Sequence, residues 1–157
     1  MERIIGIDPG SRITGYGIID TDHSQLHFVA CGVVKTTTAY PFSHRLNEIF
    51  EGINEVVHVH GPAVAAVEDV FLAMNPRSAL KLGHARGAAV VAAMQNGLAV
   101  FDYSARAVKQ AVVGYGQADK KQVQHMVRVL LGLSASPSSD AADALAVAIC
   151  HANQFNR

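Results

Sequence analysis

The order of strand-like and helical segments is the feature that most restricts the fold of this chain. Three β-rich runs at 3–8, 13–20 and 25–36 are joined by short turns. After them we expect a helix from Phe42 to the Gly61-Pro62 stop, strands at 63–68 and 98–103, and helical segments at 78–96, 105–112, 119–132 and 139–153. Right-handed crossovers place the strand that begins at Ala63 parallel to the first strand and beside it. The sequence therefore predicts an α/β fold, with a five-stranded mixed sheet flanked by helices on both faces.

The composition fits one globular domain. At 157 residues, of which 50% are hydrophobic, the chain can bury one sizeable core, and we expect a single domain over residues 1–157. No apolar stretch approaches the about 20 residues of a membrane helix, and the N-terminus leads directly into a strand, so we expect a cytoplasmic protein. Cys31 and Cys150 lack metal-ligand or redox spacing and are expected to be reduced.

Four carboxylates stand where strands end or where a helix begins. Asp8 and Glu68 each close an apolar run, whereas Asp140 and Asp143 open the last helix. Neighbouring parallel strands present their terminal residues at one rim of a sheet, and acids three residues apart share one helix face. Clustered carboxylates repel one another unless protons or cations lie between them, and oxygen ligands without nearby Cys or His suit Mg²⁺ or Mn²⁺. The pattern indicates a metal-dependent site for phosphoryl transfer.

Each acid also has an ordinary structural explanation. Asp8 before Pro-Gly is a common turn former, and Glu68 can be a solvated strand end. Asp140 and Asp143 lie in the first turns of a helix, where an acid stabilises the helix dipole by about 0.3–1 kcal/mol. The four together, on elements that would converge, favour a functional role. Asp69 leaves the strand on the side opposite to Glu68 and is not expected to be a ligand.

Charge is unevenly distributed, although the net charge is zero. Residues 1–76 carry 4 Lys and Arg against 9 Asp and Glu, or −5, and residues 77–157 carry 9 against 4, or +5. If cations offset the four clustered acids, the remaining 9 acids face 13 basic residues. The metal-loaded chain would then be positive on its C-terminal half, as a partner with a phosphate backbone requires.

Several sequence blocks follow one another over residues 3–150, nearly the whole chain. They are Gly6-Ile7-Asp8-Pro9-Gly10-Ser11-Arg12 with Thr14-Gly15-Tyr16-Gly17, Val67-Glu68 followed by Val70-Phe71, Ser78 to Gly87, Val108-Lys109-Gln110, Gln122 to Val127, and Asp140 to Ala146. In this order they resemble the RuvC family of bacterial crossover junction endodeoxyribonucleases. The resemblance implies a ribonuclease H-like fold and a homodimer that resolves four-way Holliday junctions by paired symmetric nicks in DNA recombination and repair. It also implies RuvA and RuvB, the branch-migration proteins, as partners.

The resemblance implies a two-metal mechanism as well. Two Mg²⁺ ions, for which Mn²⁺ can substitute, would lie roughly 3.5–4 Å apart, activate a water and stabilise the leaving 3′ oxygen. Asp8 would be the ligand that both ions share, and Glu68, Asp140 and Asp143 would complete the two coordination shells. The product would be a nick with 5′-phosphate and 3′-hydroxyl ends.

Candidate DNA contacts come from one aromatic and six basic residues. Phe71, just past Glu68, can stack on a base at an opened junction centre, which contributes about 1–3 kcal/mol per base. The alternative is that Phe71 anchors its loop in the core. The basic candidates for phosphate contacts, each of which can also be plain solvated surface, are Arg77, Lys81, Arg86, Lys109, Lys120 and Lys121.

The helix expected at 78–96 is the candidate dimer interface. Small residues recur there every four positions, and an apolar surface continues beyond them: Ala79, Gly83 and Gly87, then Val90, Val91 and Met94. A two-fold substrate cut at two related places needs two related active sites, which an isologous dimer supplies. The alternative is that this stripe packs on the sheet within one domain.

Other protein classes share single features of this sequence. A sugar-kinase or actin-like ATPase also opens with an Asp-x-Gly hairpin but needs a second lobe and a second phosphate loop, for which 157 residues leave no room. A catalytically inert junction-binding module requires that the acids do not converge. The YqgF group of nucleases shares the Asp-x-Gly opening, but the block from Ser78 to Gly87 favours the resolvase. Gly15-x-Gly17 lacks the third glycine of a dinucleotide loop and indicates close packing on a strand. The neutral net charge and Asp69 depart from the basic pattern of the family and bear on DNA affinity and salt tolerance.

Overall fold

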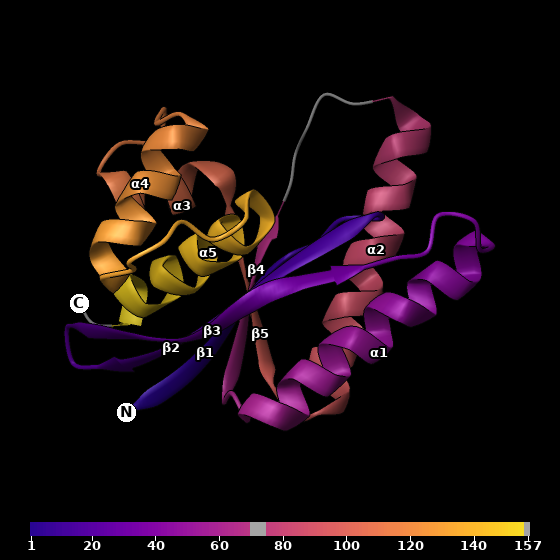
Figure 1. Cartoon of the computed structure of the whole chain (residues 1–157), viewed down its shortest axis with the longest axis horizontal. Helices are drawn as coiled ribbons and strands as arrows, with labels where there is room; N and C mark the ends of the chain where they lie inside the picture. Colours follow the sequence, from indigo (N-terminus) through magenta and orange to yellow (C-terminus); the bar gives the residue numbers. More distant parts are fainter. Residues whose placement is uncertain (70–74, 156–157) are drawn as a thin grey trace.

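A computed structural model describes residues 1–69 and 75–155, and each predicted strand and helix is present there within a few residues of its expected bounds (Figure 1). The strands are β1 (Glu2–Asp8), β2 (Ile13–Asp22), β3 (Gln25–Lys35), β4 (Val64–Asp69) and β5 (Ala99–Ser104). The helices are α1 (Phe42–His60), α2 (Pro76–Gln95), α3 (Ala105–Val113), α4 (Lys120–Leu131) and α5 (Ser139–Phe155). Among the described residues, no helix is both long and apolar enough to span a membrane.

The five strands form one mixed sheet in the order β3-β2-β1-β4-β5. β1, β2 and β3 pair antiparallel, as a meander does, and β4 and β5 continue the sheet parallel to β1. The predicted neighbourhood of β1 and β4 is confirmed, with Ile7 opposite Val67. The residues that follow this pair, Asp8 and Glu68, therefore lie at the same edge of the sheet.

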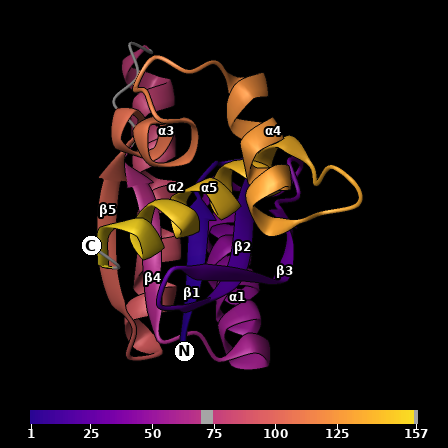
Figure 2. The same cartoon turned by 90° about the vertical axis from the view of Figure 1, so that its left-hand side faces the viewer.

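Helices cover both faces of the sheet, as predicted (Figure 2). Because side chains alternate across a strand, β1 sends Ile5 and Ile7 to one face and Ile4 to the other. α1 and α2 pack with the first set, and α3, α4 and α5 pack with the second. Two apolar layers thus hold the sheet from opposite sides, and every element that carries a candidate acid is anchored in them.

α5 lies unusually close to β1 and β2 because glycines line its path. A β carbon on Gly6 would overlap the backbone of Ala144, and one on Gly15 would overlap the backbone carbonyl of Asp140. Gly17 leaves room in the same way for the side chain of Leu145. The strand packing predicted for Gly15-x-Gly17 is confirmed. Its consequence is that the first turn of α5 rests on the strands beside Asp8.

The stripe of small residues predicted on α2, Ala79, Gly83 and Gly87, does not pack on the sheet. The buried face of α2 consists of Ala85, Ala89, Ala92 and Ala93. Gly83 and Gly87 are exposed, and a β carbon on either would meet nothing within 4 Å. Val91 and Met94 continue this exposed stripe at 49% and 56% exposure, but Val90 does not, because it packs against the core. The alternative of internal packing is therefore wrong for the glycines and right for Val90.

Candidate active site

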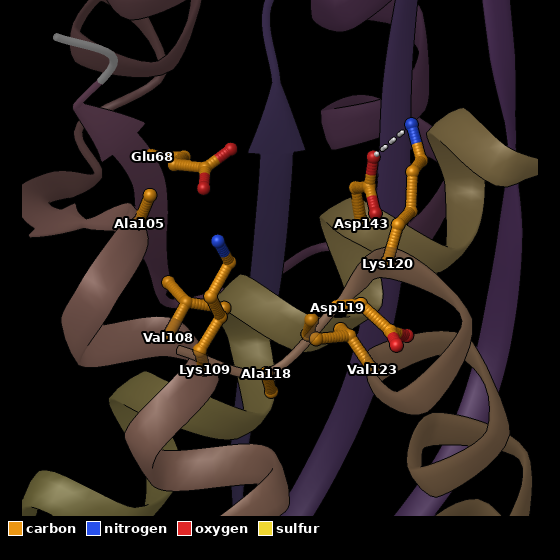
Figure 3. Close-up of a pocket in the computed structure, with 10 residues that line it drawn as sticks. Glu68, Ala105, Val108, Lys109, Ala118, Asp119, Lys120, Val123 and Asp143 are labelled. Atoms are coloured by element: carbon orange, nitrogen blue, oxygen red, sulfur yellow. Dashed lines mark ion pairs between the residues drawn. The ribbon is translucent and has the colours of Figure 1, made fainter. Parts of the chain in front are cut away.

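Three elements bring the four predicted acids to one edge of the sheet. Asp8 is the last residue of β1, Glu68 is the last but one of β4, and Asp140 and Asp143 lie in the first turns of α5. The parallel register of β1 and β4 and the close seat of α5 on Gly15 fix their relative positions. Figure 3 shows Glu68 and Asp143 at the rim of a common pocket. Residues 60 or more apart in sequence therefore meet here.

The electrostatics show that these carboxylates act on one another. Burial, followed by the charges of Asp143, Glu68 and Asp140, raises the pKa of Asp8 to about 8, although the charge of Lys120 opposes this rise. Burial also raises the pKa of Glu68, with Asp143 adding to the shift, and raises the pKa of Asp143, with Asp140 adding to it. A site that disfavours its own negative charge in this way favours a bound cation.

Two lysines supply positive charge at the same place. The Lys120 ammonium lies 3.3 Å from a carboxylate oxygen of Asp143, and it opposes the rise in the pKa of that group. The charge of Lys109 opposes the rise in the pKa of Glu68. Both lysines line the pocket together with Glu68 and Asp143 (Figure 3). The structure thus places these two of the six predicted basic residues against the acids.

The four acids supply the kind of oxygen ligand that a hard divalent cation prefers, but their side chains do not surround one point. Carboxylates are the ligands that Mg²⁺ and Mn²⁺ prefer, and the pocket that Glu68 and Asp143 line has no Cys or His in its lining. Within the described part of the chain, however, no three His, Cys, Asp or Glu side chains are close enough together to hold an ion. Charges act over several Å, whereas metal ligands need oxygen atoms about 2.0–2.1 Å from Mg²⁺.

The other predicted DNA contacts are scattered. Arg77 is exposed in the first turn of α2, and Lys121 is exposed beside Lys120. The Lys81 ammonium lies 5.9 Å from the centre of the Phe42 ring. Arg86 forms an ion pair with Asp102 of β5, and its side chain is only 29% exposed. Phe71 lies outside the described residues.

Polar contacts that sequence reasoning missed hold the elements around the acids. The Thr14 hydroxyl donates to the Gly10 carbonyl at 3.0 Å, and the Arg45 guanidinium donates to the Ser11 carbonyl at 2.7 Å, which fixes the turn after Asp8. Asp119 caps α4 with a capping box and thereby sets the start of the helix that carries Lys120. The Asp-x-x-Gln spacing could have revealed that cap, but the long-range partner of Arg45 has no signal in the sequence.

The raised pKa of Asp8 makes the stability depend on pH. This carboxyl titrates at about 8 when folded and near its ordinary value of 3.8 when unfolded, so the folded state binds more protons between these pH values. With EDTA present, the free energy of unfolding should therefore fall by the order of a few kcal/mol as the pH rises from about 4 to about 8. Glu68 and Asp143, whose pKa values are also raised, act in the same direction.

Asp8→Asn tests this dependence because an amide cannot titrate. We expect its melting temperature in EDTA to exceed that of the wild type at about pH 8 and to differ much less at about pH 5. Melting curves followed by circular dichroism across this range provide the measurement. Parallel curves for the two proteins at all pH values would show that Asp8 is not the group responsible.

Comparisons with known proteins agree with this geometry. The family model for crossover junction endodeoxyribonuclease RuvC matches residues 4–151. The crossover junction endodeoxyribonuclease RuvC of Acinetobacter baumannii is 59% identical over 153 residues, which are 98% of this chain and 84% of that protein. The protein of the same name from Legionella pneumophila is 50% identical over 156 residues, covering 99% and 90% of the two chains.

Solved structures place the chain in the same group. The structure of T. thermophilus RuvC in complex with a Holliday junction substrate superposes with a TM-score of 0.93 and 37% identity, covering 99% of this chain and 96% of that one. The yeast mitochondrial resolvase Ydc2 shares the fold alone, with a TM-score of 0.71 at 16% identity. The ribonuclease H-like fold expected from the resemblance is confirmed. Matched by its model over nearly the whole length and by relatives at 50–59% identity, the chain belongs to the RuvC family of crossover junction endodeoxyribonucleases.

Proposed function

We propose that this chain is a Holliday junction resolvase, a structure-selective endonuclease that cuts four-way DNA junctions by paired symmetric nicks in recombination and repair. The observation that carries the proposal is the meeting of Asp8, Glu68, Asp140 and Asp143, from three separate elements, where burial and mutual repulsion raise the pKa of Asp8 to about 8. The T. thermophilus relative, whose structure contains a Holliday junction substrate, supports the choice of DNA substrate.

In this proposal the four acids hold two Mg²⁺ ions, for which Mn²⁺ can substitute, with Asp8 as the shared ligand. Ions bound there would supply Lewis acidity for the attacking water and for the leaving 3′ oxygen. β1, β4 and α5 keep the carboxylates in place, because the backbone of α5 is seated on Gly6 and Gly15. Direct attack by water needs no covalent intermediate, so the products would carry 5′-phosphate and 3′-hydroxyl ends.

Two groups of basic residues, one lining the pocket and one outside it, would bind the phosphate backbone. Lys109 and Lys120 line the pocket and would contact the phosphates next to the cut. Lys121 and Arg77, which are exposed, would contact phosphates further away, as would Lys81. Arg86 would first have to leave its ion pair with Asp102, so we expect it to contribute least of the six predicted residues.

We propose further that the protein acts as a homodimer, with α2 as the interface and RuvA and RuvB as partners, in the cytoplasm of a bacterium. The exposed stripe of α2, with Gly83, Gly87, Val91 and Met94, supports the interface, and Leu80, which is 64% exposed, extends it on the same helix. Residues at this spacing form the seam along which two helices can pack. Two active sites related by a two-fold axis would then face the two strands to be cut.

A cleavage assay tests the proposed function. We expect the purified protein with Mg²⁺ to nick a synthetic four-way junction in two opposite strands, and to leave a linear duplex of the same arm sequence essentially intact. End-labelled strands separated on a denaturing gel give the positions and the ends of the cuts. Binding without cutting would favour the inert junction-binding module, and equal cutting of junction and duplex would contradict structure selectivity.

A further inference from the structure

A pocket of about 270 Å³ extends from Glu68 and Asp143, two of the four acids, between α3, α4 and α5 (Figure 3). Half of its lining is charged, with Glu68, Asp143, Lys109 and Lys120 beside Asp119, whose side chain is turned to the cap of α4. The other half is small and apolar: Ala105, Val108, Ala118, Val123 and Ala146. Pockets for drug-sized ligands hold about 300–1,000 Å³, so this one suits a smaller unit that has both a charged and an apolar side.

Charged and apolar lining residues lie within one helical turn of each other. Val108 precedes Lys109 on α3, and Val123 follows Lys120 by three positions on α4. Ala146 likewise follows Asp143 by three positions on α5. Three residues along a helix advance about 4.5 Å, so the apolar wall begins one such step from the charges. In a nucleic acid strand, the group joined directly to each phosphate is the sugar, and the base lies further away.

The apolar wall is also fixed. The Cys150 thiol donates to the Ala107 carbonyl at 3.6 Å and the Asn153 amide donates to the Ala111 carbonyl at 3.1 Å, which fastens α3 to α5. Most of the wall is part of the core, with exposures of at most 5%: Val108, Ala118, Val123 and Ala146. Ala105, at the start of α3, is the most exposed of the five wall residues. A wall held in this way presents the same apolar surface to every substrate.

We propose that this apolar wall binds the deoxyribose of a nucleotide next to the scissile phosphate and selects DNA over RNA at that nucleotide. The proposal rests on the nuclease function proposed above. Lys109 and Lys120 would hold the phosphate, and the sugar attached to it would pack on the methyl groups of Ala105 and Val108. A 2′-hydroxyl placed there would lose its hydrogen bonds to water and meet only methyl groups on these side chains, which is unfavourable.

Single ribonucleotide substitution in a four-way junction tests this selection with the wild-type chain and Mg²⁺. One ribonucleotide is placed on either side of the scissile phosphate, and in a third substrate several nucleotides away in the same arm. We expect one of the two flanking positions to slow cutting by about tenfold or more, and the distant one to have no effect. A 2′-fluoro nucleotide at the sensitive position keeps the ribose pucker but cannot donate a hydrogen bond, and should be cut at close to the DNA rate.

The variant Ala105→Leu provides an independent test, because its larger side chain fills the pocket from the most exposed side of the apolar wall. We expect normal folding and junction binding but slower cutting. Ala99→Leu, at the exposed first residue of β5 and thus at the end of that strand far from Ala105, should behave as the wild type. Equal cutting of the ribonucleotide and DNA substrates, or a 2′-fluoro nucleotide as slow as ribose, would overturn the proposal. Full cutting by a folded Ala105→Leu would overturn it too. If the wild-type protein cut no DNA junction at all, that result would contradict the proposed nuclease function, and the inference about the sugar would fall with it.

Discussion

Asp140→Asn is expected to lower the rate of junction cleavage by more than about 100-fold, the order of loss when one electrostatic stabiliser of a transition state is removed. Asn has nearly the same shape as Asp, and the backbone of residue 140 is seated on Gly15, so the fold should not change. The loss would follow from removing one of the four proposed metal ligands. Junction binding should stay intact or become stronger, because one negative charge no longer faces the phosphates.

Asp69→Asn is the matched control for this variant. Asp69 follows Glu68 on β4, so its side chain leaves the strand on the other side, and its replacement should leave cleavage close to the wild-type rate. Nicking of an end-labelled junction with Mg²⁺, a gel shift in EDTA and a melting curve separate catalysis, binding and folding. If Asp140→Asn still nicked at nearly the wild-type rate, Asp140 would not be a ligand.

The arrangement of the fold was predictable because each step used a local pattern. Alternation and turn residues predicted the meander, and the handedness of crossovers placed β4 beside β1. The pattern could not tell Val90 from Val91, because α2 is rich in alanine and glycine and lacks a clear apolar face at that point. Which of the two valines is buried depends on the helices and strands around α2, and a single helical segment does not contain that information.

The candidate site was predictable in its carboxylates but not in the partners of its charges. The proximity of Asp8 and Glu68 could be predicted because both lie at strand ends on the same edge of the sheet. Asp140 and Asp143 could be added because both lie at the start of one helix. The pairing of Arg86 with Asp102 and of Lys120 with Asp143 joins residues 16 and 23 positions apart, on different elements. Such pairs depend on tertiary placement and on rotamers. For the same reason, the sequence could indicate a metal site without showing that, in the described part of the chain, no three of the candidate side chains lie close enough together to hold an ion.

Gly87→Leu is expected to convert a dimer into a folded monomer. The position is exposed on α2, and within the protomer a β carbon there meets nothing within 4 Å. Leu is a better helix former than Gly by up to about 1 kcal/mol, so the protomer itself should not lose stability. Across a two-fold seam the added side chain acts twice, and overpacking of about 1–3 kcal/mol at each copy would weaken the dimer by about 30-fold or more.

Two measurements together decide whether this seam makes resolution symmetric. Sedimentation should show a wild-type dimer and a Gly87→Leu monomer, whereas Gln154→Leu, which adds the same side chain at an exposed position of α5, should remain a dimer. On a cruciform plasmid the wild type should linearise the DNA by two coupled cuts. The monomer has one active site in each encounter, so it should yield nicked circles at most. A wild-type protein that sediments as a monomer yet makes coupled double cuts would exclude the interface and its role, because one protomer would then serve both strands.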